Sequence, residues 1–237
     1  MKVFIDVGSN TGQTIGALFE PPDGFGRTFC KYGFDRIFCF EPVAELHPDL
    51  AAEYQDPRIT FYALGLWNKN CERPIFSPGS QGGSIFVDKV NVDPQHSTMC
   101  QFTRASDWFR EHLTETDEVY IKVNCEGCEA DIIEDLLDAK EFRKITSLGV
   151  TFDVRKIPSQ RHREEEIKRR LAEEGYENYV DLNCLPYHSH RQMIQDWLSI
   201  AGADRQTLAD RVRQVVYDCQ TFCLRVARYA RRRLSGR

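Results

Sequence analysis

The stretch VFIDVGSNTG at residues 3–12 decides the predicted fold. Its first five residues are mostly apolar and rich in β-branched side chains, which is typical of a buried parallel strand. The glycines at 8 and 12 mark a tight turn, and residues 13–19 read as a helix. A strand, a glycine turn and a helix in this order form the first unit of a doubly wound α/β sheet.

Strands and helices continue to alternate along the chain, which predicts a mostly parallel, Rossmann-like sheet with right-handed crossovers. Ser106 is the expected N-cap of one of the helices. Residues 68–104 are less regular, with a flexible loop at 78–83 and weak strand alternation at 84–92. The further strands are expected at 36–40, 59–64, 119–123, 145–152 and 176–182, and the helices at 44–54, 106–113, 129–137 and 163–174.

The alternation of strands and helices ends in the last part of the chain. Residues 188–234 have a wholly helical pattern, so we expect one domain at 1–187 with a helical extension at 188–237 packed on it. After Asp218 the extension holds six arginines and no acid. A solvated helix end is the simpler interpretation of this basic tail, and contact with an anionic substrate, RNA or a membrane surface is the alternative.

Composition narrows the classes of protein. The 237 residues are 41% hydrophobic and 28% charged, as in a globular protein, and the net charge of −5 gives no reason to expect nucleic acid as a partner. No apolar run approaches the roughly 20 residues that cross a bilayer, and Asp6 interrupts the N-terminal run too early for a signal peptide. An odd number of cysteines, nine, favours reduced thiols in the cytoplasm. The Cys125–Cys128 spacing supplies only half of a zinc site, so we predict no metal.

Ligands of such sheets bind beyond the carboxyl ends of the strands. Asp6 closes the first strand, and its carboxylate suits an ammonium group better than a phosphate. Glycines at 8, 12 and 16 do not match the dinucleotide fingerprint G-x-G-x-x-G. Glu41 closes the second strand, where a carboxylate can accept hydrogen bonds from both hydroxyls of a ribose. These features favour a nucleoside cofactor that carries an amino acid.

Four blocks of the sequence resemble the FkbM family of methyltransferases, which use S-adenosylmethionine (SAM). Residues 3–12 and the Phe-Glu-Pro of 40–42 look like the SAM site of that family. KVNCEGCE at 122–129 is similar to its Lys-Ile-Asp-Val-Glu-Gly-Ala-Glu signature, and ASDWF at 105–109 resembles the Leu-Asp-Asp-Leu-Leu helix before it. The likeness runs in the family's order over about residues 3–155.

The resemblance implies a class I methyltransferase fold, SAM as cofactor, and O-methylation of a hydroxyl on a small molecule, sugar or natural product. It places Glu41 and Pro42 at the ribose and Ala63 and Leu64 near the adenine, with Asn68 beyond them as a weaker candidate. The residues that it implies around the methionine part are Asp6, Gly8, Ser9, Asn10 and Gly12, together with Asn124.

Candidate catalytic residues follow the fourth core strand. Glu126 is the first candidate for a general base, and Glu129 is a weaker one. The alternative interpretation of both acids is that they complement the dipole at a helix N-terminus. Asn124 stands where the family has an aspartate and cannot act as a base, although it can orient a hydroxyl or an amine. Lys122 is a candidate whose simpler interpretation is an ion pair. Weaker candidates are Asp153, and His188 with His190 as a metal-binding pair.

Two other classes of function stay open at this point. The first is a nicotinamide-dependent oxidoreductase on the same general fold, against which the glycine spacing and Asp6 count. The second is a non-catalytic module that binds a nucleoside, for which Asn124 is the only support. For the methyltransferase, we expect a small-molecule or glycan acceptor.

Overall fold

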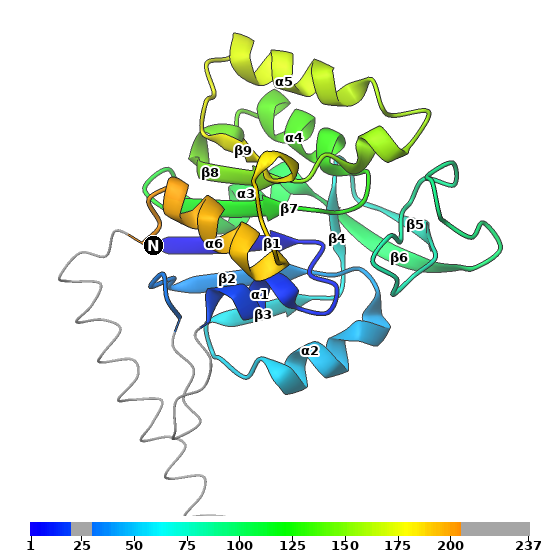
Figure 1. Ribbon diagram of the computed structural model, residues 1–237, viewed down its shortest axis with the longest axis horizontal. Helices are drawn as coiled ribbons and strands as arrows, with labels where there is room; N and C mark the ends of the chain where they lie inside the picture. Colours follow the sequence, from blue (N-terminus) through cyan, green and yellow to red (C-terminus); the bar gives the residue numbers. More distant parts are fainter. Residues whose placement is uncertain (20–29, 205–237) are drawn as a thin grey trace, which may run out of the picture.

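Six strands form one sheet in which every neighbouring pair is parallel, in the order β3-β2-β1-β7-β8-β9 (Figure 1). The computed structural model describes residues 1–19 and 30–204. Counted within this sheet, the order is 3-2-1-4-5-6, which reverses between β1 and β7. The predicted doubly wound α/β class is therefore confirmed. The strands are β1 (Lys2–Val7), β2 (Arg36–Phe40), β3 (Ile59–Tyr62), β7 (Glu118–Val123), β8 (Ile145–Val150) and β9 (Tyr179–Asp181).

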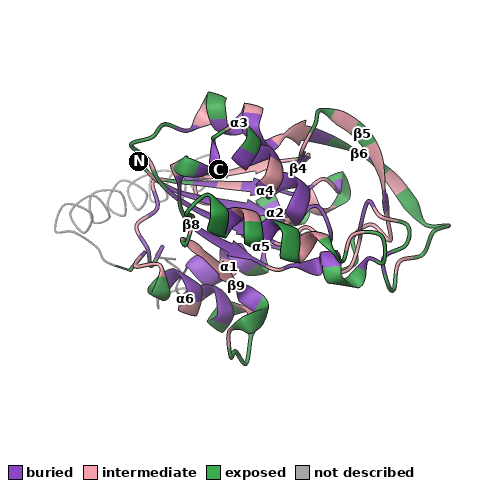
Figure 2. Ribbon diagram, turned by 90° about the horizontal axis from the view of Figure 1, so that it is seen from above, coloured by how far each residue is buried: buried purple, intermediate pink, exposed green. Residues whose placement is uncertain are grey.

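The central strands are buried on both faces, which explains their nearly continuous apolar sequence. In β1, Val3, Ile5 and Val7 pack into one hydrophobic cluster, whereas Phe4 packs into a second cluster on the opposite face. Figure 2 shows this buried centre with exposed residues on the outer surfaces of the helices.

Helices cover both faces of the sheet. The cluster around Phe4 includes side chains of α1 (Gln13–Leu18), α2 (His47–Glu53) and α6 (His190–Ile200). The opposite cluster includes side chains of α3 (Ala105–His112), α4 (Glu129–Asp138) and α5 (Arg163–Glu173). None of the helices in the described part of the chain is long and apolar enough to cross a membrane. Short 3-10 turns complete the elements: η1 (Ala44–Leu46), η2 (Phe142–Lys144), η3 (Asp153–Lys156) and η4 (Leu182–Cys184).

A second sheet of three strands, in the order β4-β6-β5, lies beside the carboxyl ends of the large sheet (Figure 1). No pattern in the sequence predicted this sheet, and the weak strand alternation at 84–92 does not form a strand. That segment forms turns instead, in which Lys89 is buried at 5% exposure while Val87 and Val90 are 53% and 55% exposed. The strands are β4 (Gly65–Trp67), β5 (Cys71–Phe76) and β6 (Ser97–Arg104).

The expected N-cap at Ser106 is also wrong. Helix α3 begins one residue earlier, and Arg104 occupies the cap position without a side-chain cap bond. Asp135 of α4 takes over the capping instead. It accepts the backbone N–H of Ser106 at 2.8 Å and pairs with Arg104 at 2.6 Å. A carboxylate from a neighbouring helix therefore satisfies this helix start.

Helix α6 belongs to the core of the described molecule. Trp197 is fully buried, and its indole N–H donates to Ser147 Oγ on β8 at 3.0 Å. A Cβ on Gly149 would lie 2.7 Å from the indole ring, so the strand needs glycine where the helix packs. The division at residue 187 stays a prediction, and residues 205–237 with the basic tail lie outside the described residues.

Replacing Trp197 with alanine should lower the free energy of unfolding by about 3–5 kcal/mol, because it removes a large side chain from a packed core. Ile200 on the same helix is 65% exposed, so Ile200→Ala should change it by less than about 0.5 kcal/mol. Urea unfolding followed by circular dichroism measures both. Equal losses in the two variants would contradict an integral α6.

Candidate functional site

A cavity of about 340 Å³ lies at the carboxyl ends of β1, β2 and β7, where the strand order reverses. Clefts at this position are the usual ligand sites of doubly wound sheets. The three strand ends are held together there. The N–H groups of Gly8 and Ser9 donate to Phe40 O at 3.0 and 3.1 Å, and Asn124 N–H donates to Val7 O at 3.1 Å. The predicted site residues that line the cavity are Gly8, Ser9, Asn10, Glu41, Pro42, Lys122, Asn124 and Glu126.

Gly8 permits the close approach of two strand ends. Its φ is +81°, and a Cβ at this position would lie 2.0 Å from Asn124 O. A side chain there would push apart β1 and β7 at the floor of the cavity. Gly12 has the same φ but a different reason for being glycine, because its Cβ would lie 2.4 Å from the Tyr54 ring. Gly12 packs against the end of α2 and does not line the cavity, contrary to the prediction.

Glu41 presents its carboxylate to the cavity from the end of β2. Its two oxygens accept the N–H of Asn10 at 2.8 Å and of Val43 at 3.0 Å, and the residue is 6% exposed. Burial raises the pKa of Glu41, and the two backbone hydrogen bonds oppose that rise. A carboxylate has about four lone-pair sites, so Glu41 can still accept hydrogen bonds from two hydroxyls of a ligand.

Asp6 lies beneath the glycine loop and does not line the cavity. Its carboxylate is 2.9 Å from Lys122 Nζ, and both side chains are at most 2% exposed. Lys122 also donates to the carbonyls of Val7 and Gly8 at 3.3 and 2.9 Å. The ammonium group that Asp6 was expected to meet in a cofactor is therefore supplied by the protein, and Lys122 is held as an ion-pair partner.

The adenine candidates Ala63 and Leu64 are also absent from the cavity wall. Ala63 is exposed, and the chain enters β4 only at the next residues. Leu66 of β4, Ile75 of β5 and Phe102 of β6 form an apolar part of the wall instead. These side chains come from the small sheet, which no local pattern had predicted. Asn68 does not line the cavity either.

Glu126 and Glu129 differ although they are three residues apart. Glu126 has a φ of +58°, lines the cavity and pairs with Lys89 at 2.9 Å. Burial raises its pKa, as does the charge of Asp153. Glu129 is fully buried and accepts the N–H groups of Gly127 and Val154, both at 2.7 Å. Burial raises the pKa of Glu129 to about 7. Glu129 thus joins the loop after β7 to η3, and of these two glutamates only Glu126 lines the cavity.

Asn124 adds an unused acceptor to the site. Its Oδ1 is buried without a hydrogen-bond partner and the residue lines the cavity. A buried oxygen that accepts no hydrogen bond destabilises the fold unless a ligand or a water molecule donates one to it. A donor group such as an amine or hydroxyl would fit this atom.

The two histidines do not act together. His188 is exposed, whereas His190 begins α6 and lines the cavity, with Nε2 3.0 Å from Thr14 Oγ1. Burial and then the charge of Lys122 lower the pKa of His190, so its imidazole is neutral at pH 7. Among the described residues, no group of three or more His, Cys, Asp and Glu side chains is arranged to hold a metal ion. Cys125 and Cys128 are free thiols in the cavity wall.

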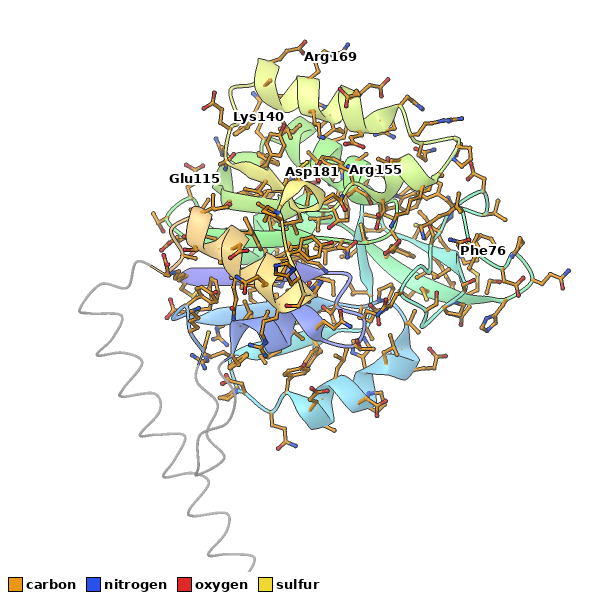
Figure 3. The ribbon with its side chains drawn as sticks, viewed as in Figure 1. Phe76, Glu115, Lys140, Arg155, Arg169 and Asp181 are labelled. Atoms are coloured by element: carbon orange, nitrogen blue, oxygen red, sulfur yellow. The ribbon has the colours of Figure 1, made fainter. Side chains whose placement is uncertain are left out.

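The loop at 77–84 covers part of the cavity. Gly79, Ser80, Gln81 and Gly83 all line it, and Asn10 Nδ2 donates to Ser80 O at 3.1 Å. The loop follows β5, whose last residue Phe76 is labelled on the arm at the right of Figure 3. Its glycines predicted a flexible loop, and the structure places that loop in the cavity wall.

Comparison with solved structures finds that this chain is similar to the crystal structure of the methyltransferase FkbM from Methylobacillus flagellatus KT. The TM-score is 0.41 at 15% sequence identity, over 72% of this chain and 37% of that one. No protein-family model and no curated protein matches the sequence. Because the match covers only 37% of the similar structure, this chain spans well under half of its length.

Replacing Lys122 with methionine should lower the free energy of unfolding by about 3–5 kcal/mol, because Asp6 would stay buried without its partner. The double variant Asp6→Asn/Lys122→Met removes both charges and should recover part of that loss. Urea unfolding at pH 7 gives both values. A stable single variant would mean that Lys122 is not held as an ion-pair partner.

Proposed function

We propose that this chain binds SAM and transfers its methyl group to a hydroxyl of a small molecule, sugar or natural product. One observation carries the proposal. The Glu41 carboxylate, the Gly8–Asn10 loop and the unpartnered Asn124 Oδ1 all face the same cavity at the switch point of the sheet. A nucleoside that carries an amino acid has a ribose for the carboxylate and an amine for the amide oxygen.

The residues present fit such a cofactor. Glu41 would accept hydrogen bonds from the ribose hydroxyls, and Asn124 Oδ1 would accept one from the amino group. The apolar wall of Leu66, Ile75 and Phe102 would take the adenine. Asp6, Gly12, Ala63 and Leu64 are left out of this set because none of them lines the cavity.

Bound SAM supplies an electrophilic methyl group, so the chain itself must orient the acceptor and take its proton. Glu126 is the carboxylate in the cavity that suits this step. Its pKa is raised by burial, and a more basic carboxylate accepts a hydroxyl proton more readily. In the proposed step, the proton of the acceptor hydroxyl moves to a carboxylate oxygen of Glu126. Lys122 is excluded as the base because its ammonium is held by Asp6 and two carbonyls.

A nicotinamide-dependent oxidoreductase is the second candidate, because the 3-2-1-4-5-6 order is also that of dinucleotide-binding sheets. The loop counts against it. In the dinucleotide fingerprint G-x-G-x-x-G, the second glycine lets the backbone approach the pyrophosphate, and in this chain Asn10 stands at that position. Its side chain is engaged with Ser80 O, and Gly12 packs on Tyr54.

Isothermal calorimetry should detect binding of SAM and S-adenosylhomocysteine and no binding of NAD. Glu41→Gln should weaken SAM binding about tenfold or more, because hydrogen bonds to a charged acceptor are the stronger ones. Glu45 is exposed and does not line the cavity, so Glu45→Gln is the matched control and should bind as the parent protein does. Binding of NAD without SAM would refute the proposal.

Glu126→Gln should lower methyl transfer by about 10²- to 10⁴-fold, the usual contribution of a general base, while SAM affinity stays within about twofold. Transfer from radiolabelled SAM to a panel of hydroxylated small molecules and sugars measures the rate, and calorimetry measures the affinity. The exposed Glu72 on β5 does not line the cavity, and Glu72→Gln should transfer at the parent rate. Undiminished transfer by Glu126→Gln would remove Glu126 from the mechanism.

A further inference from the structure

A buried lysine links the cavity to the loop that covers it. Lys89 is 5% exposed although it belongs to an irregular surface segment. Its ammonium is 2.9 Å from Glu126 Oε2 and donates to Gly82 O at 2.7 Å. A buried ammonium is costly without such partners, so this geometry depends on both contacts.

The loop at 77–84 is tied to the site at three points. Asn10 Nδ2 donates to Ser80 O at 3.1 Å, and Lys89 donates to Gly82 O. The hydroxyl of Ser84 donates to the backbone carbonyl of Glu126 at 2.6 Å. Two of the three ties thus end on Glu126 or on the lysine that pairs with it. The position of the loop and the position of the Glu126 carboxylate are therefore coupled.

The other charges near Glu126 come from η3 and α4. Lys156 lines the cavity, but its ammonium pairs with Asp153 at 2.6 Å. Asp153 raises the pKa of Glu126, after burial, while Lys89 and Lys156 lower it. Glu129 is buried and held by two backbone N–H groups. Among the described residues, Lys89 is the cation in direct contact with the Glu126 carboxylate.

We propose that Lys89 is a positioning residue, which fixes the Glu126 carboxylate in the cavity and couples it to closure of the loop at 77–84. The inference rests on the proposed function, in which Glu126 takes the acceptor proton. Once Glu126 is protonated, its attraction for Lys89 falls, and the tie to Gly82 loses its anchor. Proton transfer would then loosen the loop at the moment when the product must leave.

Carbon-13 NMR of protein with labelled glutamate tests the first half of this proposal. Glu126→Gln assigns the carboxyl resonance, whose titration is then followed in the ligand-free full chain. Lys89→Met should raise the pKa of Glu126, because its contacting cation is lost. Lys89→Arg should stay near the parent value. Lys156→Met is the matched control for a nearby charge and should raise the pKa less than Lys89→Met does.

Amide hydrogen exchange tests the second half. In the parent protein, Ser84 N–H donates to Phe76 O at 3.1 Å and is protected while the loop is closed. Amides at 77–84 should exchange about tenfold faster in Lys89→Met, since a charge-assisted hydrogen bond holds the loop. Lys156→Met should leave their exchange unchanged.

A second variant keeps the test decisive if Lys89→Met does not fold. Lys89→Gln removes the charge that attracts Glu126 while keeping a polar side chain, so it should raise the pKa of Glu126 and also speed the exchange of the amides at 77–84. Unchanged titration of Glu126, or unchanged exchange at 77–84, in whichever of Lys89→Met and Lys89→Gln folds would overturn the proposal. Both measurements use ligand-free protein, so a failure of SAM to bind refutes the proposed function separately.

Discussion

The ion pair between Asp6 and Lys122 is the constraint on which the site depends. The two residues face each other in register on β1 and β7, the strands between which the sheet order reverses. Lys122 also holds the carbonyls of Val7 and Gly8, so a single ammonium neutralises the buried acid and fixes the start of the glycine loop. A buried Asp6 or Lys122 without its partner would cost several kcal/mol. The same ion pair therefore fixes the backbone at the floor of the cavity and balances the charges buried there.

Environment separates the two glutamates that follow β7. Glu129 is enclosed by the backbone N–H groups of Gly127 and Val154 and binds two loops together. Glu126 points into the cavity against the ammonium of Lys89. The residue type is the same, and both carboxyls have a raised pKa because of burial. Only Glu126 lines the cavity, so access to the cavity rather than acidity distinguishes the two carboxyls.

The surroundings of the cavity come from segments that are distant in the sequence. The small β4-β6-β5 sheet supplies the apolar wall, and the loop at 77–84 lines another part of the cavity. Outside the site, Arg155 of η3 and Asp181 of β9, both labelled in Figure 3, form another contact between distant segments, at 3.4 Å. His190 reaches the cavity from the start of α6 and meets Thr14 near the start of α1. The large sheet thus provides the edge of strand ends at which the cavity lies, and the small sheet, the loop at 77–84 and the start of α6 complete its wall.

The sequence by itself determined the strands of the large sheet, the glycine turn and the acid at the end of β2. A strand that is buried on both faces requires a continuous apolar run, and a turn with positive φ favours glycine. Both features can therefore be recognised from neighbouring residues in the sequence. Only the tertiary structure decided that Lys122 is the partner of Asp6, that Asp135 caps α3 and that the small sheet walls the cavity. Each of these depends on contacts between residues far apart in the chain, and such contacts leave no periodic pattern in the sequence around either partner.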